Sequence, residues 1–434
     1  MVVRPPITEG GGQPMKIWTL IAAVRLAMLG SGPGFAQNAY IANYDDGTVS
    51  VIDTTKDKVI ATVPVGRFPE YVAVSPDGAT AYTLSDSGIV VIDTKKNNVT
   101  ATISPPPAIP PTIPLRSMCS PGDIAGCPTS LAIPLLNGSK LYVGGDPAWV
   151  IDTKTNIATS LPFAASVLGV SPDGTQLYTT YAVNNDGAYN DAYYLKIIST
   201  TNYQVINSIL LFSSPFRISY CCDTTQIVAK TDGTKVYISA FDDYAGTPSV
   251  FEADLTNNSA TIVSSQTDTG EALSLNGTTL YVGDDLDEPC AVVGFNLATN
   301  QISGCVRFPP LIIYTFTEDV SLTPDGSKLY VASSNGIYFA NQTSPIGGVF
   351  VINTATNSII TTILVGNNPI SLGQFIQPPQ IFVGTPGKNN CYDKSIKALT
   401  RNYSDMLGAA AALGFDSVAL LQNALTGFCA QPTS

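Results

Sequence analysis

The acidic run Asp284-Asp285-Leu286-Asp287-Glu288 is the densest group of potential metal ligands in the sequence. Carboxylate oxygens are the ligands that hard cations prefer. The run lacks the ligand spacing of an EF-hand loop. A solvated acidic turn is therefore the preferred interpretation, and a Ca²⁺ site is the alternative. That site would use Asp284, Asp285, Asp287 and Glu288, and Ca²⁺ is the one cofactor the sequence suggests.

Arginine stands beside phenylalanine in several segments that link predicted structural units. A guanidinium group attracts anions and stacks on aromatic rings, so such pairs could hold an anionic or aromatic ligand. The alternative is that each arginine pairs with a nearby carboxylate and each phenylalanine packs inside the protein. The candidate ligand-binding residues are Arg67, Phe68, Phe216, Arg217, Arg307 and Phe308.

Histidine is absent from the 434 residues. Its absence excludes a Ser-His-Asp triad, a Cys-His pair and any histidine-ligated metal. The formal net charge of −12 provides no basic surface for nucleic-acid phosphates. We therefore predict no catalytic residues and no nucleic-acid partner.

Eight cysteines occur without any C-x-x-C motif, which argues against a zinc knuckle and against a thioredoxin-like redox pair. An even number of cysteines in an exported chain favours disulfides. Spacing suggests three pairs and leaves two adjacent cysteines, which could form a strained vicinal disulfide. The expected pairs are Cys119–Cys127, Cys290–Cys305, Cys391–Cys429 and Cys221–Cys222.

An export signal is predicted near the N-terminus. Met15-Lys16 precedes the apolar run 17–29, and small residues at Gly34 and Ala36 suit cleavage after Ala36. The run is too short to span a bilayer. We expect an upstream extension and signal peptide at 1–36, a folded domain at 37–380 and a C-terminal helical module at 381–434.

A repeat of about 48 residues organises the central domain and indicates its fold. Each unit has an apolar strand, a turn such as Ser75-Pro76-Asp77-Gly78, a strand headed by tyrosine, an acidic loop and two more strands. Seven four-stranded units predict an all-β, seven-bladed β-propeller. The tyrosine anchors are Tyr40, Tyr82, Tyr142, Tyr178, Tyr237, Tyr281 and Tyr330.

The repeats resemble the YVTN family of β-propeller proteins. The tetrad reads Tyr40-Ile41-Ala42-Asn43, and looser copies begin at Tyr142 and Tyr330. The resemblance covers about residues 38–376 and implies a protein of the periplasm or cell surface with an undefined ligand. Similar seven-bladed discs occur in periplasmic dehydrogenase subunits and in lactonases. The first expectation is an exported scaffold that binds a ligand or protein. The alternative is a metal-dependent lactonase-like hydrolase or a dehydrogenase subunit.

The two faces of the predicted disc differ in sequence. The connection face holds the blade-to-blade links and the loops between second and third strands, which are acidic. The turn face holds the other, more uniform turns. Binding usually resides on irregular loops over a rigid scaffold, so we place an unknown protein or small anionic ligand on the connection face. The proline-rich insert 105–127 is expected there too, as a tolerated insertion or as a lid.

Ring closure and the C-terminus complete the expected fold. Residues 370–375 form a first strand without partners of its own, so they should join the blade of residues 38–65. The apolar spacing after residue 380 becomes helical. Gly408 could divide the first helical stretch and Gly414 could end it, with Asp416 or Ser417 capping the next helix. No transmembrane segment is expected.

Overall fold

The structure is a computed structural model of the chain. Its described residues are 37–106, 130–165, 167–183, 191–214, 222–242, 247–264, 270–283, 290–308, 316–337, 346–377 and 381–431.

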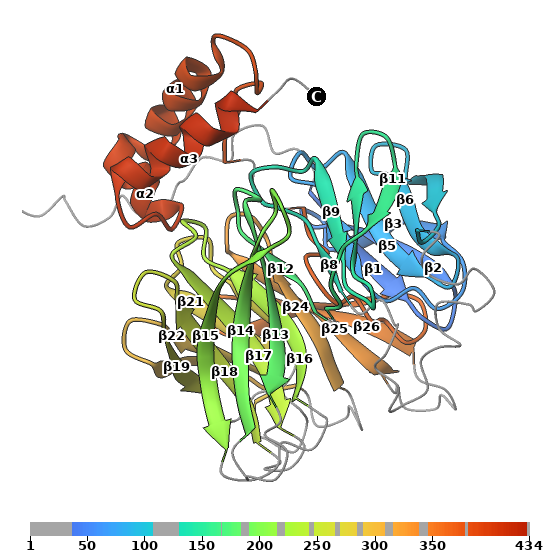
Figure 1. The fold of residues 1–434 in the computed structure, drawn as a ribbon. Coiled ribbons are helices and arrows are strands. Elements are labelled where there is room, and N and C mark those ends of the chain that lie inside the picture. The colour runs from blue at the N-terminus through green and yellow to red at the C-terminus, as the bar shows by residue number, and fades with distance from the viewer. Residues whose placement is uncertain are drawn as a thin grey trace, which may run out of the picture. The chain divides into compact units, whose positions relative to one another are not determined.

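Seven antiparallel sheets succeed one another along the chain and form the seven blades of a propeller, which confirms the predicted fold (Figure 1). The blades are numbered here in chain order, and each runs from an inner strand near the axis to an outer edge strand. Blade 1 has β1 (Asn38–Asn43), β2 (Thr48–Asp53) and β3 (Lys58–Pro64). Blade 2 has β4 (Val72–Val74), β5 (Thr80–Ser85), β6 (Gly88–Asp93) and β7 (Asn98–Ile103). Blade 3 has β8 (Leu131–Ala132), β9 (Lys140–Val143), β10 (Trp149–Asp152) and β11 (Ile157–Ser160).

The remaining four blades repeat this order with longer strands in several positions. Blade 4 has β12 (Gly169–Val170), β13 (Gln176–Val183), β14 (Asp191–Ser199) and β15 (Val205–Ser214). Blade 5 has β16 (Cys222–Ala229), β17 (Lys235–Asp242), β18 (Thr247–Asp254) and β19 (Ser259–Ser264). Blade 6 has β20 (Glu271–Leu273), β21 (Thr279–Gly283), β22 (Val292–Asn296) and β23 (Gln301–Val306). Blade 7 has β24 (Phe316–Leu322), β25 (Lys328–Ile337), β26 (Ile346–Asn353) and β27 (Ser358–Leu364).

The tyrosine anchors lie in the apolar core, each with at most 9% of its surface exposed. Apolar side chains on both faces of the second and third strands make these strands fit between neighbouring blades. The outer strands instead alternate between exposed and half-buried residues, as in β3 and β7. At blade 7, the Tyr330 hydroxyl donates to the Asp57 carboxylate of blade 1, so an anchor also joins two blades.

The turns between first and second strands have the geometry that their sequence predicts. The Ser75 hydroxyl donates to the Asp77 carboxylate over 2.6 Å, and that carboxylate accepts the backbone N–H of Ala79. Gly78 has a φ of 67°, which a residue with a side chain adopts with difficulty. Equivalent bonds recur at Asp173 and Asp325. The Ser-Pro-Asp-Gly motif thus sets local backbone geometry.

The turns that lead into the outer strands share a second feature, which was not predicted from the sequence. In six blades the residue directly before the outer strand has a positive φ between 50° and 58°, and in blade 4 the residue with this conformation lies one position earlier. Asparagine and aspartate tolerate this left-handed conformation better than other residues with side chains. The seven positions are Asp57, Asn97, Asn156, Tyr203, Asn258, Asn300 and Asn357.

Asn97→Ala is expected to lower the free energy of unfolding by about 1 kcal/mol, because alanine is strained in the left-handed region. Urea denaturation of the purified protein measures this effect. Asn97→Gly should cause a smaller loss, because glycine adopts the conformation freely. Equal losses in both variants would show that the asparagine side chain, and not backbone strain, matters here.

The segment that follows β27 closes the ring in the predicted place, beside β1. The Ile370 N–H donates to the Ala42 carbonyl over 2.9 Å, and the Tyr40 N–H donates to the Phe375 carbonyl over 2.8 Å. These bonds place the segment 370–376 at the inner side of β1, where it forms isolated bridges and not the regular strand that was predicted, so the sheet of blade 1 has three strands. The Val72 N–H also donates to the Leu372 carbonyl, so the same segment contacts blade 2.

Polar side chains join three pairs of neighbouring blades at their inner strands. The Leu168 N–H of blade 4 donates to the Ser130 hydroxyl of blade 3 over 2.9 Å. Between blades 5 and 6, the Glu271 N–H of blade 6 donates to the Gln226 side-chain carbonyl of blade 5. The Gly373 N–H of blade 1 donates to the carboxylate of Asp319, which lies in blade 7. Each bond satisfies a backbone donor at the inner edge of a blade.

Three helices follow the propeller: α1 (Cys391–Tyr403), α2 (Met406–Ala412) and α3 (Val418–Ala430). A Cys391–Cys429 disulfide joins the start of α1 to the end of α3, as predicted. The expected break at Gly408 is wrong, because α1 ends at Tyr403 and Gly408 lies inside α2. Asp405 caps α2 by accepting the Gly408 N–H over 2.7 Å. Among the described helices, none is both long and apolar enough to cross a membrane.

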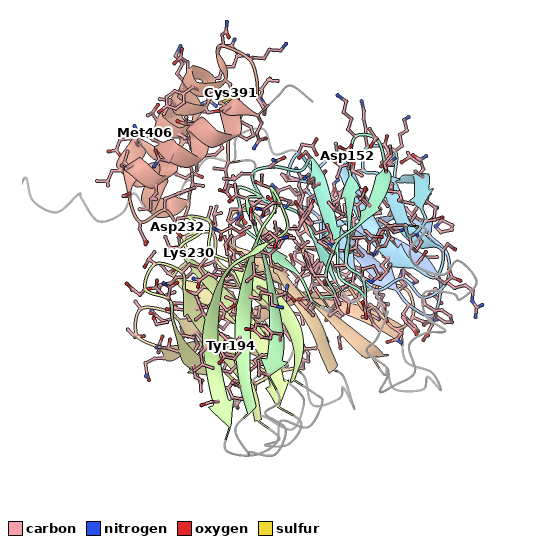
Figure 2. All side chains as sticks on the ribbon, viewed as in Figure 1. Asp152, Tyr194, Lys230, Asp232, Cys391 and Met406 are labelled. Carbon is pink, nitrogen blue, oxygen red and sulfur yellow. A yellow bond between two sulfur atoms is a disulfide. The ribbon has the colours of Figure 1, made fainter. Side chains whose placement is uncertain are left out.

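The helical module contacts the turn face of the propeller through an apolar cluster and an ion pair. Leu136 of blade 3 belongs to the module's cluster, and Leu135 and Leu275 pack against it. Lys230 of blade 5 lies 3.0 Å from Asp232 and 2.6 Å from Asp416, which precedes α3. Figure 2 labels Lys230 and Asp232 beside the helical module. The two carboxylates raise the pKa of Lys230, whose burial alone would lower it. The lysine is therefore held charged at this contact.

Candidate functional site

Several predicted site residues lie outside the described part of the chain. Cys222 is described through its backbone alone, as the first residue of β16. The structure therefore does not test the predicted Cys221–Cys222 link, the pair Phe216 and Arg217 or the acidic run 284–288, and these stay predictions. The positions outside the described residues are Cys119, Cys127, Phe216, Arg217, Cys221, Asp284, Asp285, Asp287 and Glu288.

The predicted Cys290–Cys305 disulfide is present in blade 6. The two sulfur atoms are 2.06 Å apart and the Cα atoms 5.2 Å apart. Cys290 precedes β22, and Cys305 lies on the adjacent strand β23. The bond therefore joins two strands that are already paired, and its position within one sheet indicates a structural role.

Arg67, which is exposed, and Phe68, which is half-buried, form a pair on the connection face, between β3 and β4. The Arg67 guanidinium lies 4.7 Å from the centre of the Phe68 ring, within the range of a cation–π interaction. The Phe68 ring in turn lies 5.1 Å from that of Tyr44. Within the described residues, no carboxylate forms an ion pair with Arg67. The pair thus presents a positive charge on an aromatic base.

Contacts with Asp86 hold this pair, and Phe68 has a left-handed conformation that recurs at the link between blades 7 and 1, where Asn368 has a φ of 51°. The Arg67 N–H donates to the Asp86 carboxylate over 3.1 Å, and the Asp86 N–H donates to the Arg67 carbonyl over 3.0 Å. Gly66 precedes the pair with a φ of 98°, and Phe68 itself has a φ of 55°. A bulky residue in the left-handed region is strained by about 1–3 kcal/mol. Such strain is concentrated at functional sites, which makes the Phe68 segment a candidate site.

Arg307 and Phe308 are arranged differently. Arg307 is exposed, but the Phe308 ring stacks on Phe350 with centroids 4.0 Å apart and joins the core cluster of blades 6 and 7. Phe308 therefore packs inside the protein, as the alternative interpretation of the sequence predicted. No contact among the described residues brings Arg307 to Arg67.

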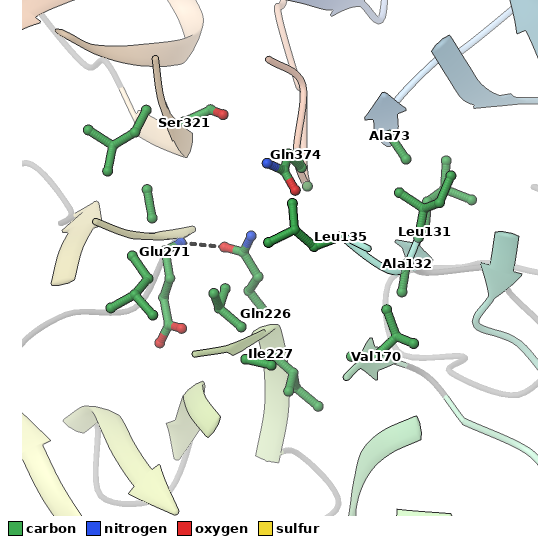
Figure 3. A pocket seen from close by; sticks show the side chains of 18 of the residues that line it. Ala73, Leu131, Ala132, Leu135, Val170, Gln226, Ile227, Glu271, Ser321 and Gln374 are labelled. Carbon is green, nitrogen blue, oxygen red and sulfur yellow. Dashed lines mark hydrogen bonds between the residues drawn. The ribbon is translucent and has the colours of Figure 1, made fainter. Parts of the chain in front are cut away.

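The inner strands enclose a cavity of about 220 Å³ near the propeller axis (Figure 3). All seven blades contribute to its wall, and blade 1 does so through residues 372–374 of the closing segment. Figure 3 shows the amide of Gln226 directed to the backbone N–H of Glu271, while the Glu271 carboxyl group points away from that amide. The cavity was not predicted from the sequence, because the aliphatic and amide side chains that line it do not mark a binding site by their residue type.

Glu271 is a fully buried carboxylic acid next to this cavity, with 2% of its surface exposed. One carboxyl oxygen forms a hydrogen bond with the Ser239 hydroxyl of blade 5, and the other has no partner within the described residues. Burial raises the pKa of Glu271 to about 8, although the bond with Ser239 lowers it. At neutral pH the group is therefore mainly uncharged and can donate a proton in a hydrogen bond.

Comparison with known proteins adds a fold likeness. No family model matches the sequence, and no curated protein sequence matches it. The structure is similar to one described as Kuenenia stuttgartiensis hydrazine synthase, with a TM-score of 0.53 and 18% identity over 73% of this chain and 92% of that one. It is also similar to the dihydro-heme d1 dehydrogenase NirN in complex with DHE, with a TM-score of 0.47 and 13% identity over 77% and 74%. At these identities the likeness is one of fold.

Proposed function

We propose that this chain is an exported propeller that binds a small anionic ligand on its connection face, at Arg67 and Phe68. The strained Phe68 backbone carries this proposal. Strain of this kind persists only where the surrounding structure enforces it. Here the bonds between Arg67 and Asp86 enforce it, and the result is an exposed guanidinium stacked on a ring. An aromatic carboxylate suits both features, because its charge meets the guanidinium and its ring meets Phe68 or Tyr44.

Export is the second part of the proposal. The predicted signal sequence before residue 37 supports it, and so do the disulfides Cys290–Cys305 and Cys391–Cys429, because such bonds persist mainly in oxidising compartments. The tyrosine-anchored repeats support membership of a YVTN-like group of exported propellers. We propose a binding scaffold without catalysis of its own.

Arg67→Gln is expected to weaken the binding of benzoate at least tenfold, because the variant removes the positive charge and keeps a polar side chain, although a shorter one. Isothermal titration of benzoate, with benzamide as the uncharged analogue, measures the effect. Benzamide affinity should change little, since benzamide carries no charge for Arg67 to attract. Phe68→Ala should weaken both probes, because it removes the stacking surface.

Lys154→Gln is the matched control, because Lys154 is an exposed cation on the turn face, in the turn between β10 and β11. It changes the net charge by the same amount as Arg67→Gln and should leave benzoate binding unchanged. If Lys154→Gln weakens benzoate binding as much as Arg67→Gln does, the effect is one of overall charge and the proposed site is wrong. Tightly held Ca²⁺ in the purified protein would instead favour a metal-dependent hydrolase.

A further inference from the structure

The axial cavity has an aliphatic wall built from equivalent positions of the repeat. The residue directly before the first turn lines the cavity in four consecutive blades, and each of these side chains is half-buried. Blade 5 contributes alanine at this position, whereas its neighbours contribute larger residues, so the wall recedes at blade 5. The four residues are Val170, Ala229, Leu273 and Leu322.

The polar groups of the cavity are mainly uncharged. Its described lining residues include the amides of Gln226 and Gln374 and include no lysine or arginine. Glu271 is the one carboxylic acid of the lining, and its raised pKa keeps it mainly protonated at neutral pH. A charged ligand would lose its hydration here without gaining an opposite charge, which is costly. The lining thus favours an uncharged ligand over an ionic one.

The helical module borders this cavity. Leu135 and Leu275 line the cavity and also pack against the module's apolar cluster. A cavity with an aliphatic wall and a few polar groups that fix orientation is the usual form of a small-molecule site. The lining runs along the inner strands and includes Tyr71, but it includes neither Arg67 nor Phe68.

We propose that the axial cavity is a second binding site, which takes a small uncharged molecule with an apolar body and one hydrogen-bonding group. The apolar body contacts the aliphatic wall, and the hydrogen-bonding group meets the amide of Gln226 or Gln374. The site is independent of the anion site at Arg67, because the two sites share none of the residues named for them.

Benzyl alcohol is the probe for this site, with benzoate and benzylammonium as its anionic and cationic analogues. Isothermal titration into the purified full chain should show saturable binding of one benzyl alcohol. Ala229→Phe should weaken this binding at least tenfold, because the larger side chain fills the recess at blade 5. Ala229→Leu should weaken it less, and it is compatible with the fold, because leucine stands at the equivalent position in blades 6 and 7.

Arg67→Gln is the control, and it should leave benzyl alcohol binding unchanged while it weakens benzoate binding. The Ala229 variants should have the opposite pattern, so failure of either site is distinguishable from failure of the other. The cavity proposal is overturned if benzyl alcohol does not saturate or if both Ala229 variants bind it as the parent protein does. It is also overturned if benzylammonium binds in the cavity as tightly as benzyl alcohol.

Discussion

Phe375→Ala is expected to lower the free energy of unfolding by about 3–5 kcal/mol, the usual cost of removing a buried phenylalanine side chain. Phe375 is fully buried and lies in the closing segment, where it packs in the core cluster of blade 1. Its backbone carbonyl accepts the Tyr40 N–H, so loss of its packing weakens the contact between the two ends of the ring. Chemical denaturation followed by circular dichroism measures the loss.

Leu364→Ala is the matched control, because Leu364 ends the outer strand β27 with 47% of its surface exposed. A surface substitution of this kind should change the free energy of unfolding by less than about 0.5 kcal/mol. Two similar losses would mean that the closing segment contributes no more to stability than the outer edge of a blade.

Glu271 should make the protein less stable as the pH rises from about 4.5 to about 8. The pKa of this acid is raised from 4.5 in the unfolded chain to about 8 in the folded protein, so the folded state retains a proton that the unfolded state loses. The stabilising effect of that proton is complete below pH 4.5 and is lost as the pH rises toward 8. The free energy of unfolding that is lost over this pH range is on the order of 4 kcal/mol, because the group is fully buried.

Glu271→Gln should abolish this part of the pH dependence, because the amide keeps an oxygen for Ser239 and does not ionise. Urea denaturation of both proteins at pH 5 and pH 8 gives the comparison, since all other titrating groups are common to the two. The variant should be the more stable protein at pH 8. If the two proteins lose equal stability over this range, Glu271 is already ionised in the folded state.

The fold could be predicted because the blades repeat the same short sequence motifs at matching positions. Ser75-Pro76-Asp77-Gly78 and its copies define turns by short-range hydrogen bonds, and buried tyrosines recur at matching positions. The closing segment 370–376 was predictable for a related reason, since a strand without partners needs an edge. The end of α1 was not predictable, because both Asp405 and Gly408 suit a helix boundary. In the structure Asp405 caps α2, and Gly408 lies inside that helix.

The candidate sites were less predictable, because they depend on contacts between distant parts of the chain. Arg67 and Phe68 were recognisable as residue types, whereas the left-handed backbone of Phe68 lies next to bonds between Arg67 and Asp86, which is 19 residues from Arg67. Glu271 attracts no notice in the sequence, since its burial and raised pKa come from neighbouring blades. The repeated asparagines before the outer strands were a visible signal, and their left-handed conformation could have been predicted from them.

The way the ring closes also sets an order of events during synthesis. β1 is the first strand of the propeller to be made, yet its inner neighbour is the segment 370–376. Roughly 300 residues separate the two, which corresponds to on the order of 15–60 s of translation. Until then the nascent chain can complete other blades but cannot join its two ends. The finished disc therefore forms only after residues 370–376 have been synthesised, and a chain that stops before them lacks the contact that closes the ring.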